Sequence, residues 1–156
     1  MVVRHVLHPF AFPGALLTAI ASLAATAWAE TGVPPDVHVQ HDGVTLDAYT
    51  GNGRIAFCFN ADKNVRIASE YGVEFKVPRS QAKLWKEPLP KLVAGKEPYF
   101  DLPLRIELKT RGASRPRQVS MGLGVCVSAI YCTPVSFEIT IPATNGAGGE
   151  FPACAN

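Results

Sequence analysis

The strongest constraint on the fold is a period of two in the hydrophobic pattern. In residues 135–141 every second residue is apolar and those between are polar: Val135, Phe137, Ile139 and Ile141 against Ser136, Glu138 and Thr140. Because side chains on a β-strand point alternately to opposite faces, this segment predicts a strand with one buried face. Similar alternation occurs in residues 44–49, 73–77, 104–109 and 119–125.

Turn residues separate these predicted strands. Gly51-Asn52-Gly53 accept positive φ and predict a hairpin between residues 44–49 and 54–59. Helix is scarce: residues 80–86 can form one turn before Pro88 and Pro90 stop it. Residues 87–103 hold four prolines and predict a long ordered loop. About seven short strands predict an all-β, antiparallel β-sandwich.

The first 29 residues have the three parts of a secretory signal peptide. A basic start at residues 4–8 precedes apolar residues 10–25, and Ala27 and Ala29 mark a cleavage site before Glu30. We therefore predict a signal peptide at 1–29 and a single mature domain at 30–156. No later segment reaches the roughly 18 to 20 apolar residues that cross a bilayer, so we expect a soluble mature chain without a membrane span.

The charge of the mature chain is nearly balanced. Removing Arg4 from the 15 Lys and Arg residues leaves 14, against 13 Asp and Glu. A net charge near +1 gives no electrostatic reason to expect binding to nucleic acid or to an anionic membrane. We expect a partner recognised by shape and chemistry instead.

All four cysteines follow the predicted signal peptide, and an even number in an exported chain predicts disulfides. Three pairings are possible. A hairpin could bring Cys126 and Cys132 within the roughly 4.4 to 6.8 Å between Cα atoms that a disulfide needs. Pairing Cys58 with Cys154 would close a loop near 100 residues and stabilise the fold by about 4.7 kcal/mol, against about 2 to 2.5 kcal/mol for the short loop.

We interpret the Cys58–Cys154 pair as structural and the Cys126–Cys132 pair, which lies by a loop, as the candidate for exchange. By spacing alone, a C-x5-C pair in a secreted domain is more often a static disulfide than a reactive one. His38 and His41 lack the spacing of a zinc site, and we expect neither a metal nor a cofactor.

Three basic residues surround Pro116, and we expect them to form a solvated hairpin tip: Arg111, Arg115 and Arg117. At most they would contact an acidic partner at the rim of an interface.

Residues 124–134 read Gly-Val-Cys-Val-Ser-Ala-Ile-Tyr-Cys-Thr-Pro, with an aromatic residue directly before the second cysteine and proline soon after. With Leu89-Pro90, residues 95–97 and residues 102–106, this motif resembles the N-terminal periplasmic domain of the DsbD family of thiol:disulfide interchange proteins. The likeness extends over about residues 70–142. It implies an immunoglobulin-like sandwich, a periplasmic location and one redox-active cysteine pair.

The resemblance also implies unequal roles, in which Cys132 forms mixed disulfides with partners and Cys126 resolves them. The implied partners are thioredoxin-like periplasmic proteins or a membrane reductant carrier. Because the chain has neither of the family's other domains, we expect it to need a separate reductant. The family shields its disulfide with a cap loop; here Tyr99, Phe100 and Asp101 could supply a cap, or they could be core residues that lead into the next strand.

Two functions remain open on the sequence. The first is a periplasmic thiol:disulfide exchange module, a possible oxidoreductase that passes reducing equivalents through Cys126 and Cys132. The alternative is a non-catalytic secreted β-sandwich, a binding or assembly module with two structural disulfides.

Overall fold

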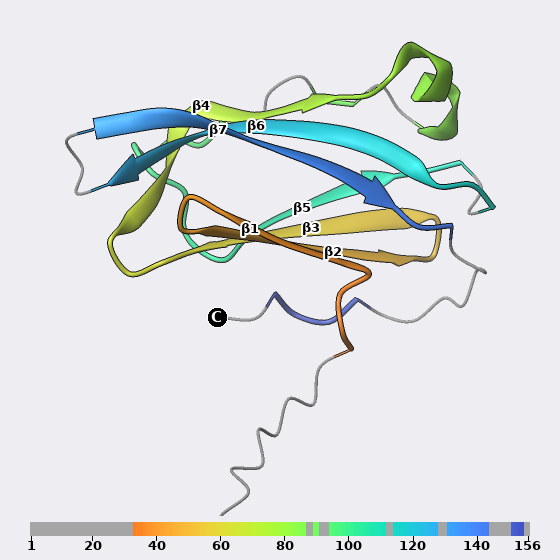
Figure 1. Ribbon diagram of the computed structural model, residues 1–156, viewed down its shortest axis with the longest axis horizontal. Coiled ribbons are helices and arrows are strands. Elements are labelled where there is room, and N and C mark those ends of the chain that lie inside the picture. The colour runs from red at the N-terminus through yellow and green to blue at the C-terminus, as the bar shows by residue number, and fades with distance from the viewer. Residues whose placement is uncertain are drawn as a thin grey trace, which may run out of the picture. The chain divides into compact units, whose positions relative to one another are not determined.

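The computed structural model describes residues 33–86, 89–90, 94–111, 114–127, 131–143 and 151–154. The predicted signal peptide lies outside these residues. The described part of the chain forms seven strands and one short 3₁₀ helix (Figure 1). The elements are β1 (Val37–His41), β2 (Val44–Gly51), β3 (Arg54–Ala61), β4 (Val65–Lys76), η1 (Arg79–Leu84), β5 (Leu104–Lys109), β6 (Arg117–Val127) and β7 (Tyr131–Ile141).

The strands form two antiparallel sheets, one with the order β1-β2-β3-β5 and one with the order β4-β6-β7. Strand β3 pairs with β5, while the intervening β4 crosses to the other sheet and pairs with β6. This crossover places β2, β3 and β5 opposite β4, β6 and β7, as in an immunoglobulin-like Greek key. The predicted all-β, immunoglobulin-like sandwich is confirmed. The first strand, β1, was not foreseen from the sequence.

The core lies between the two sheets and is built from one face of each strand. In β7, Val135, Phe137, Ile139 and Ile141 are buried and the residues between them are exposed, as the period of two predicts. Aromatic side chains join the sheets: the ring centroids of Phe59 and Phe137 are 6.3 Å apart. The register of each strand therefore decides which side chains face solvent, and this places the site described below.

The end of the sandwich near η1 differs from expectation at one residue. Arg117 begins β6 and is only 2% exposed, so it is not part of a solvated hairpin tip. Loss of water around its guanidinium lowers the pKa of Arg117. The prediction was wrong for Arg117 because the residue falls on the core-facing side of β6, in phase with Val119 and Met121. Arg111 and Arg115 are exposed, as expected.

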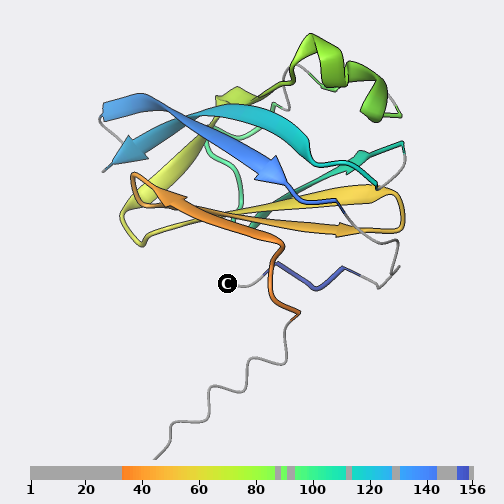
Figure 2. The same cartoon turned by 45° about the vertical axis from the view of Figure 1, so that its right-hand side comes forward.

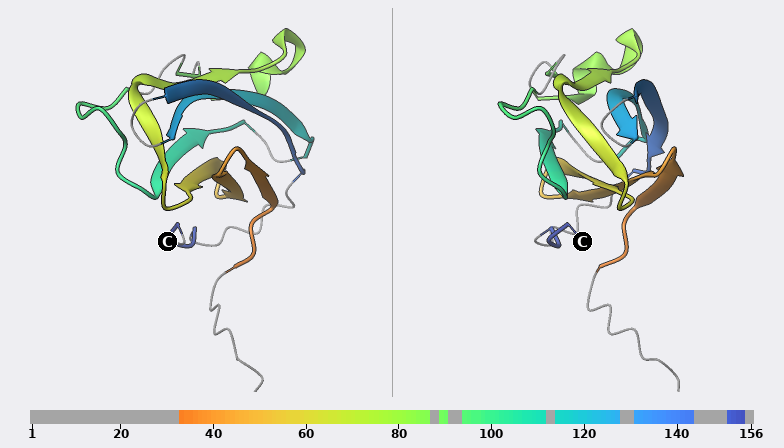
Figure 3. Two further views of the ribbon diagram at one scale, coloured as in Figure 1. Left: turned by 60° about the vertical axis from the view of Figure 1, so that its left-hand side comes forward. Right: turned by 90° about the vertical axis from the view of Figure 1, so that its left-hand side faces the viewer.

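The Cys58–Cys154 disulfide is present, with the Cα atoms 5.6 Å apart. Cys58 lies on the outer face of the four-stranded sheet, where it is buried beside Tyr49 and Ala56 under the C-terminal residues 151–154. Arg105 holds the same segment: its guanidinium lies 5.7 Å from the centroid of the Phe151 ring, and its Nη1 donates to the Pro152 carbonyl at 3.0 Å. The C-terminal segment thus runs across the sheet that is remote from β6 and β7 (Figures 2 and 3).

We expect the double substitution Cys58→Ala/Cys154→Ala to lower the free energy of unfolding by about 2 to 5 kcal/mol, because the pair closes a long loop. Urea unfolding of the variant and the parent measures the difference. Reactivity of the Cys126–Cys132 pair should not change, since that pair lies on the other sheet. A stability change within about 0.5 kcal/mol would show that the C-terminal segment is held by its other contacts.

Candidate functional site

The second disulfide joins the two strands of the β6–β7 hairpin. Cys126 and Cys132 lie directly opposite each other in the register, and their Cα atoms are 3.9 Å apart. This is shorter than the roughly 4.4 to 6.8 Å expected for a disulfide. The strands continue for one more pair, Val127 with Tyr131. Residues 128–130 lie outside the described part.

This disulfide lies on the solvent side of its sheet. The core-facing residues of β6 are Val119, Met121, Leu123 and Val125, so Cys126 points to the opposite face. Cys126 is nevertheless 0% exposed, whereas Cys132 is exposed at the edge of the sheet. Of the two residues, Cys132 is therefore the one that a partner can reach.

A β-bulge in β4 brings an aromatic side chain over this face. The pairing of β4 with β6 jumps from Ala68 opposite Gly124 to Val73 opposite Leu123, which leaves residues 69–72 without partners on β6. Gly72 has φ +63°, a conformation that favours glycine. Bulges re-aim side chains, and here Tyr71 lies against Gly124: a Cβ atom at residue 124 would be 2.7 Å from Tyr71 Cδ2.

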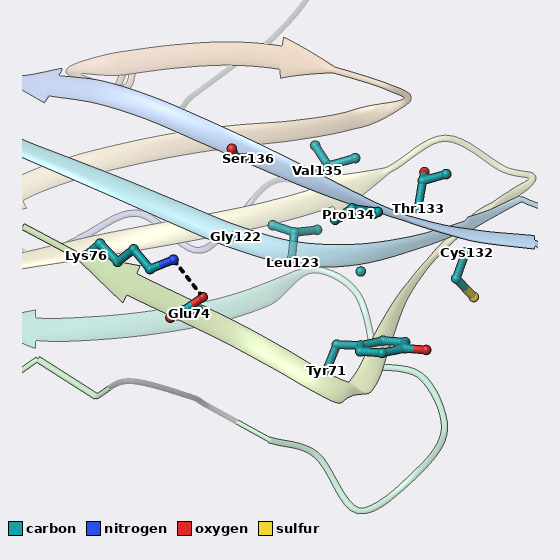
Figure 4. Close-up of a pocket in the computed structure, with 11 residues that line it drawn as sticks. Tyr71, Glu74, Lys76, Gly122, Leu123, Cys132, Thr133, Pro134, Val135 and Ser136 are labelled. Atoms are coloured by element: carbon teal, nitrogen blue, oxygen red, sulfur yellow. Dashed lines mark ion pairs between the residues drawn. The ribbon is translucent and has the colours of Figure 1, made fainter.

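Cys132 and Tyr71 line one end of a groove of about 880 Å³ that runs along the outer face of this sheet (Figure 4). The bulge of β4 supplies Tyr71, and the residues that face solvent on the three strands supply most of the rest. The full lining is Tyr71, Glu74, Lys76, Gly122, Leu123, Gly124, Cys132, Thr133, Pro134, Val135 and Ser136.

Residues that face each other across β4, β6 and β7 form rows, and successive rows on the outer face divide the groove along its length. The row next to the disulfide holds Gly124 opposite Pro134, with the Tyr71 ring beside them. The following row holds Glu74, Gly122 and Ser136. At the far end, Lys76 Nζ lies 3.1 Å from a carboxylate oxygen of Glu74. The groove is therefore apolar near Cys132 and polar away from it.

Exposed hydrophobic side chains gather at the same end of the molecule. Among the described residues, the large hydrophobic side chains that are exposed are Val33, Tyr71, Val127 and Tyr131. Val127 and Tyr131 form the pair next to the disulfide, and they are 50% and 70% exposed. Clustered apolar exposure of this kind marks interaction surfaces.

Sequence reasoning missed Arg66. This residue lies directly opposite Cys126 on β4 and faces solvent on the same side of the sheet, so one row across the three strands reads Arg66, Cys126, Cys132. A cation beside a thiol favours the thiolate. Nothing in the sequence indicates that Arg66 is close to Cys126, because the two are 60 residues apart and only the pairing of β4 with β6 brings them together.

The predicted cap residues lie beyond β4. Tyr99 forms a bridge with Ala68, and the amide of Phe100 donates to the Ile67 carbonyl at 3.0 Å, so this segment lines the free edge of β4. Phe100 packs against the main core, and Asp101 is exposed. Strand β4 thus separates the three residues from β6, and their role as a cap stays a prediction.

Within the described ranges, no group of three or more His, Cys, Asp or Glu side chains could hold a metal ion. No helix in that part of the chain is long and apolar enough to cross a membrane. Comparisons of the chain with protein-family models, with curated proteins and with solved structures find no match.

We expect Gly124→Ala to displace the Tyr71 ring, because the new Cβ would lie 2.7 Å from its Cδ2 atom. The cost should be about 1 kcal/mol of unfolding free energy, since the ring is 57% exposed and can move. Gly122→Ala is the matched control: nothing lies within 4 Å of a Cβ there, and its effect should stay within about 0.5 kcal/mol.

Urea unfolding and the NMR shifts of the Tyr71 ring measure both variants. Equal effects of the two substitutions would contradict the placement of Tyr71 over Gly124.

Proposed function

We propose that this protein is a thiol:disulfide exchange module of the periplasm, resembling the N-terminal domain of the DsbD family. Its working pair is Cys126–Cys132, and Cys58–Cys154 is structural. The observation that carries the proposal is the unequal exposure of the pair: Cys132 is exposed at the end of a groove, and Cys126, opposite it in the register, is fully buried.

The exchange would proceed in two steps. In the reduced protein, the Cys132 thiolate attacks one sulfur of a partner's disulfide; a mixed disulfide forms and the partner's second sulfur leaves as a thiolate. The Cys126 thiolate then attacks Cys132, which reforms the Cys126–Cys132 bond and releases the partner's first sulfur. Two electrons pass to the partner, and a separate thioredoxin-like protein or membrane reductant carrier would supply them again.

The surroundings of the pair support these roles. A mixed disulfide with a bulky partner needs an accessible sulfur, which Cys132 provides. The resolving thiol needs only to reach Cys132, and the direct pairing of the two residues keeps it there. Exposed Tyr71 lies on the same face as the pair, and the exposed residues Val127 and Tyr131 are next to the pair in the register, so this end of the sheet offers apolar side chains to which a second protein could dock.

The reduction potential of Cys126–Cys132 tests the proposal. With Cys58 and Cys154 intact, we expect a potential between about −180 and −270 mV, the range of proteins that exchange disulfides. The protein is equilibrated in redox buffers, alkylated and analysed by mass spectrometry. A potential below about −300 mV would mark a static disulfide and favour the non-catalytic binding or assembly module instead.

We also expect Arg66→Gln to slow alkylation of the reduced pair by iodoacetamide at neutral pH about three- to fivefold, the size expected of one nearby solvated charge. Arg79→Gln is the control, because it removes the same charge from η1, at the other end of β4. A rate equal to that of the parent in Arg66→Gln would show that Arg66 does not favour the thiolate.

A further inference from the structure

We infer that the groove beside Cys132 binds the partner in a particular way: it receives an extended segment of the partner chain that adjoins the partner's cysteine. The segment carries an apolar residue two positions from that cysteine and a polar residue four positions from it. This inference rests on the proposed exchange at Cys132 and adds to it which sequences the site selects.

Cys132 itself fixes where the segment begins. The residue lines the groove, so a partner sulfur bonded to it places the partner's backbone at the apolar end. From Cys132 to Ser136 the groove follows five residues of β7, which are four steps of about 3.3 Å or roughly 13 Å. An extended partner segment of about five residues, its cysteine included, spans the same length.

The spacing of side chains along an extended partner segment matches the spacing of the rows on the sheet. In an extended chain, alternate side chains point to the same side, so the residue two positions from the partner's cysteine points to the sheet as the cysteine does. On the outer face of the sheet, the rows that contain Cys132, Pro134 and Ser136 are likewise two residues apart along β7. That residue therefore meets the row of Tyr71, Gly124 and Pro134, where a tyrosine ring and an exposed proline ring provide apolar contact.

The residue four positions away meets the next row, which is polar. Glu74 and Ser136 flank Gly122 there, and Lys76 lies beyond, paired with Glu74 at 3.1 Å. Because both charges are present and exposed, this end favours a polar side chain without selecting its sign.

The middle of the groove is open because Gly122 has no side chain. A Cβ atom at residue 122 would meet nothing within 4 Å, so the space above this part of β6 is free. Glycine on the exposed face of a strand lets another backbone approach closely. The same feature supplies a blocking variant: Gly122→Leu would project into the groove without touching the core.

The test uses the Cys126→Ala protein, which keeps Cys132 and cannot resolve a mixed disulfide. The probes are short peptides with one cysteine carried as a mixed disulfide with 2-nitro-5-thiobenzoate. The Cys132 thiolate attacks the peptide sulfur, the protein–peptide disulfide forms, and the coloured 2-nitro-5-thiobenzoate thiolate leaves. Its absorbance gives the second-order rate constant. The same mixed disulfide of glutathione measures the intrinsic reactivity of Cys132.

Two peptides present leucine two positions before or two positions after the cysteine, followed outward by two serines, and matched peptides carry glycine in place of leucine. For one of the two directions we expect the leucine peptide to react about tenfold faster than its glycine match, the gain from covering a good part of one apolar side chain. In Tyr71→Ala the ratio should fall to near one. Dividing by the glutathione rate removes any change in Cys132 itself.

Gly122→Leu should lower the rate at which Cys132 reacts with the leucine peptide that carries the two serines. The rate with a leucine peptide that lacks the two serines should not change. Gln118→Leu is the matched control, since it adds the same side chain to the exposed face of the same strand outside the groove. Circular dichroism confirms folding of each variant. If Gly122→Leu does not fold, the leucine-to-glycine ratio in Tyr71→Ala still decides the question.

Leucine-to-glycine ratios near one in both directions, with glutathione reacting normally, would overturn the groove inference and leave the exchange function standing. A folded Cys126→Ala protein whose Cys132 reacts with none of the mixed disulfides would overturn both.

Discussion

The register between β6 and β7 is the constraint on which the site depends. Each of the two strands turns every second residue toward the core, so a slip of one residue would turn Val125 to the solvent face and Cys126 toward the core. Eleven facing pairs hold this register, and the disulfide between Cys126 and Cys132 locks one of them. The buried face of the hairpin thus fixes the chemistry of its exposed face.

The two disulfides lie on different sheets of the sandwich. Cys58 and Cys154 fasten the C-terminal segment over the four-stranded sheet, where Phe151 and Arg105 add further contacts. Cys126 and Cys132 lie on the three-stranded sheet, on the face that carries the groove. Because the two pairs lie on different sheets, reduction of Cys126–Cys132 would leave Cys58–Cys154 in place, as the proposed exchange function requires.

The bulge in β4 shows how a local irregularity can build a site. Residues 69–72 have no partners on β6, and the freed chain turns at Gly72 so that Tyr71 lies against Gly124. Without the four extra residues, regular pairing would continue and the aromatic wall of the groove would be missing. Tyr71 is ambiguous in the sequence because an aromatic residue at a strand end is more often part of a core.

The sequence by itself determined the class of fold and most of the strands, and it predicted the two cysteine pairs that the structure shows. These follow from local periodicity, from turn residues such as Asn52 and Gly53, and from loop lengths, all of which act within short stretches of chain. Only the tertiary structure decided which sulfur is exposed, that Arg66 lies opposite Cys126, that Arg117 is buried, and that Glu74, Gly122 and Ser136 share one row. Such neighbours depend on the pairing of strands far apart in the chain, and that pairing is set by how two whole sheets bury their apolar faces.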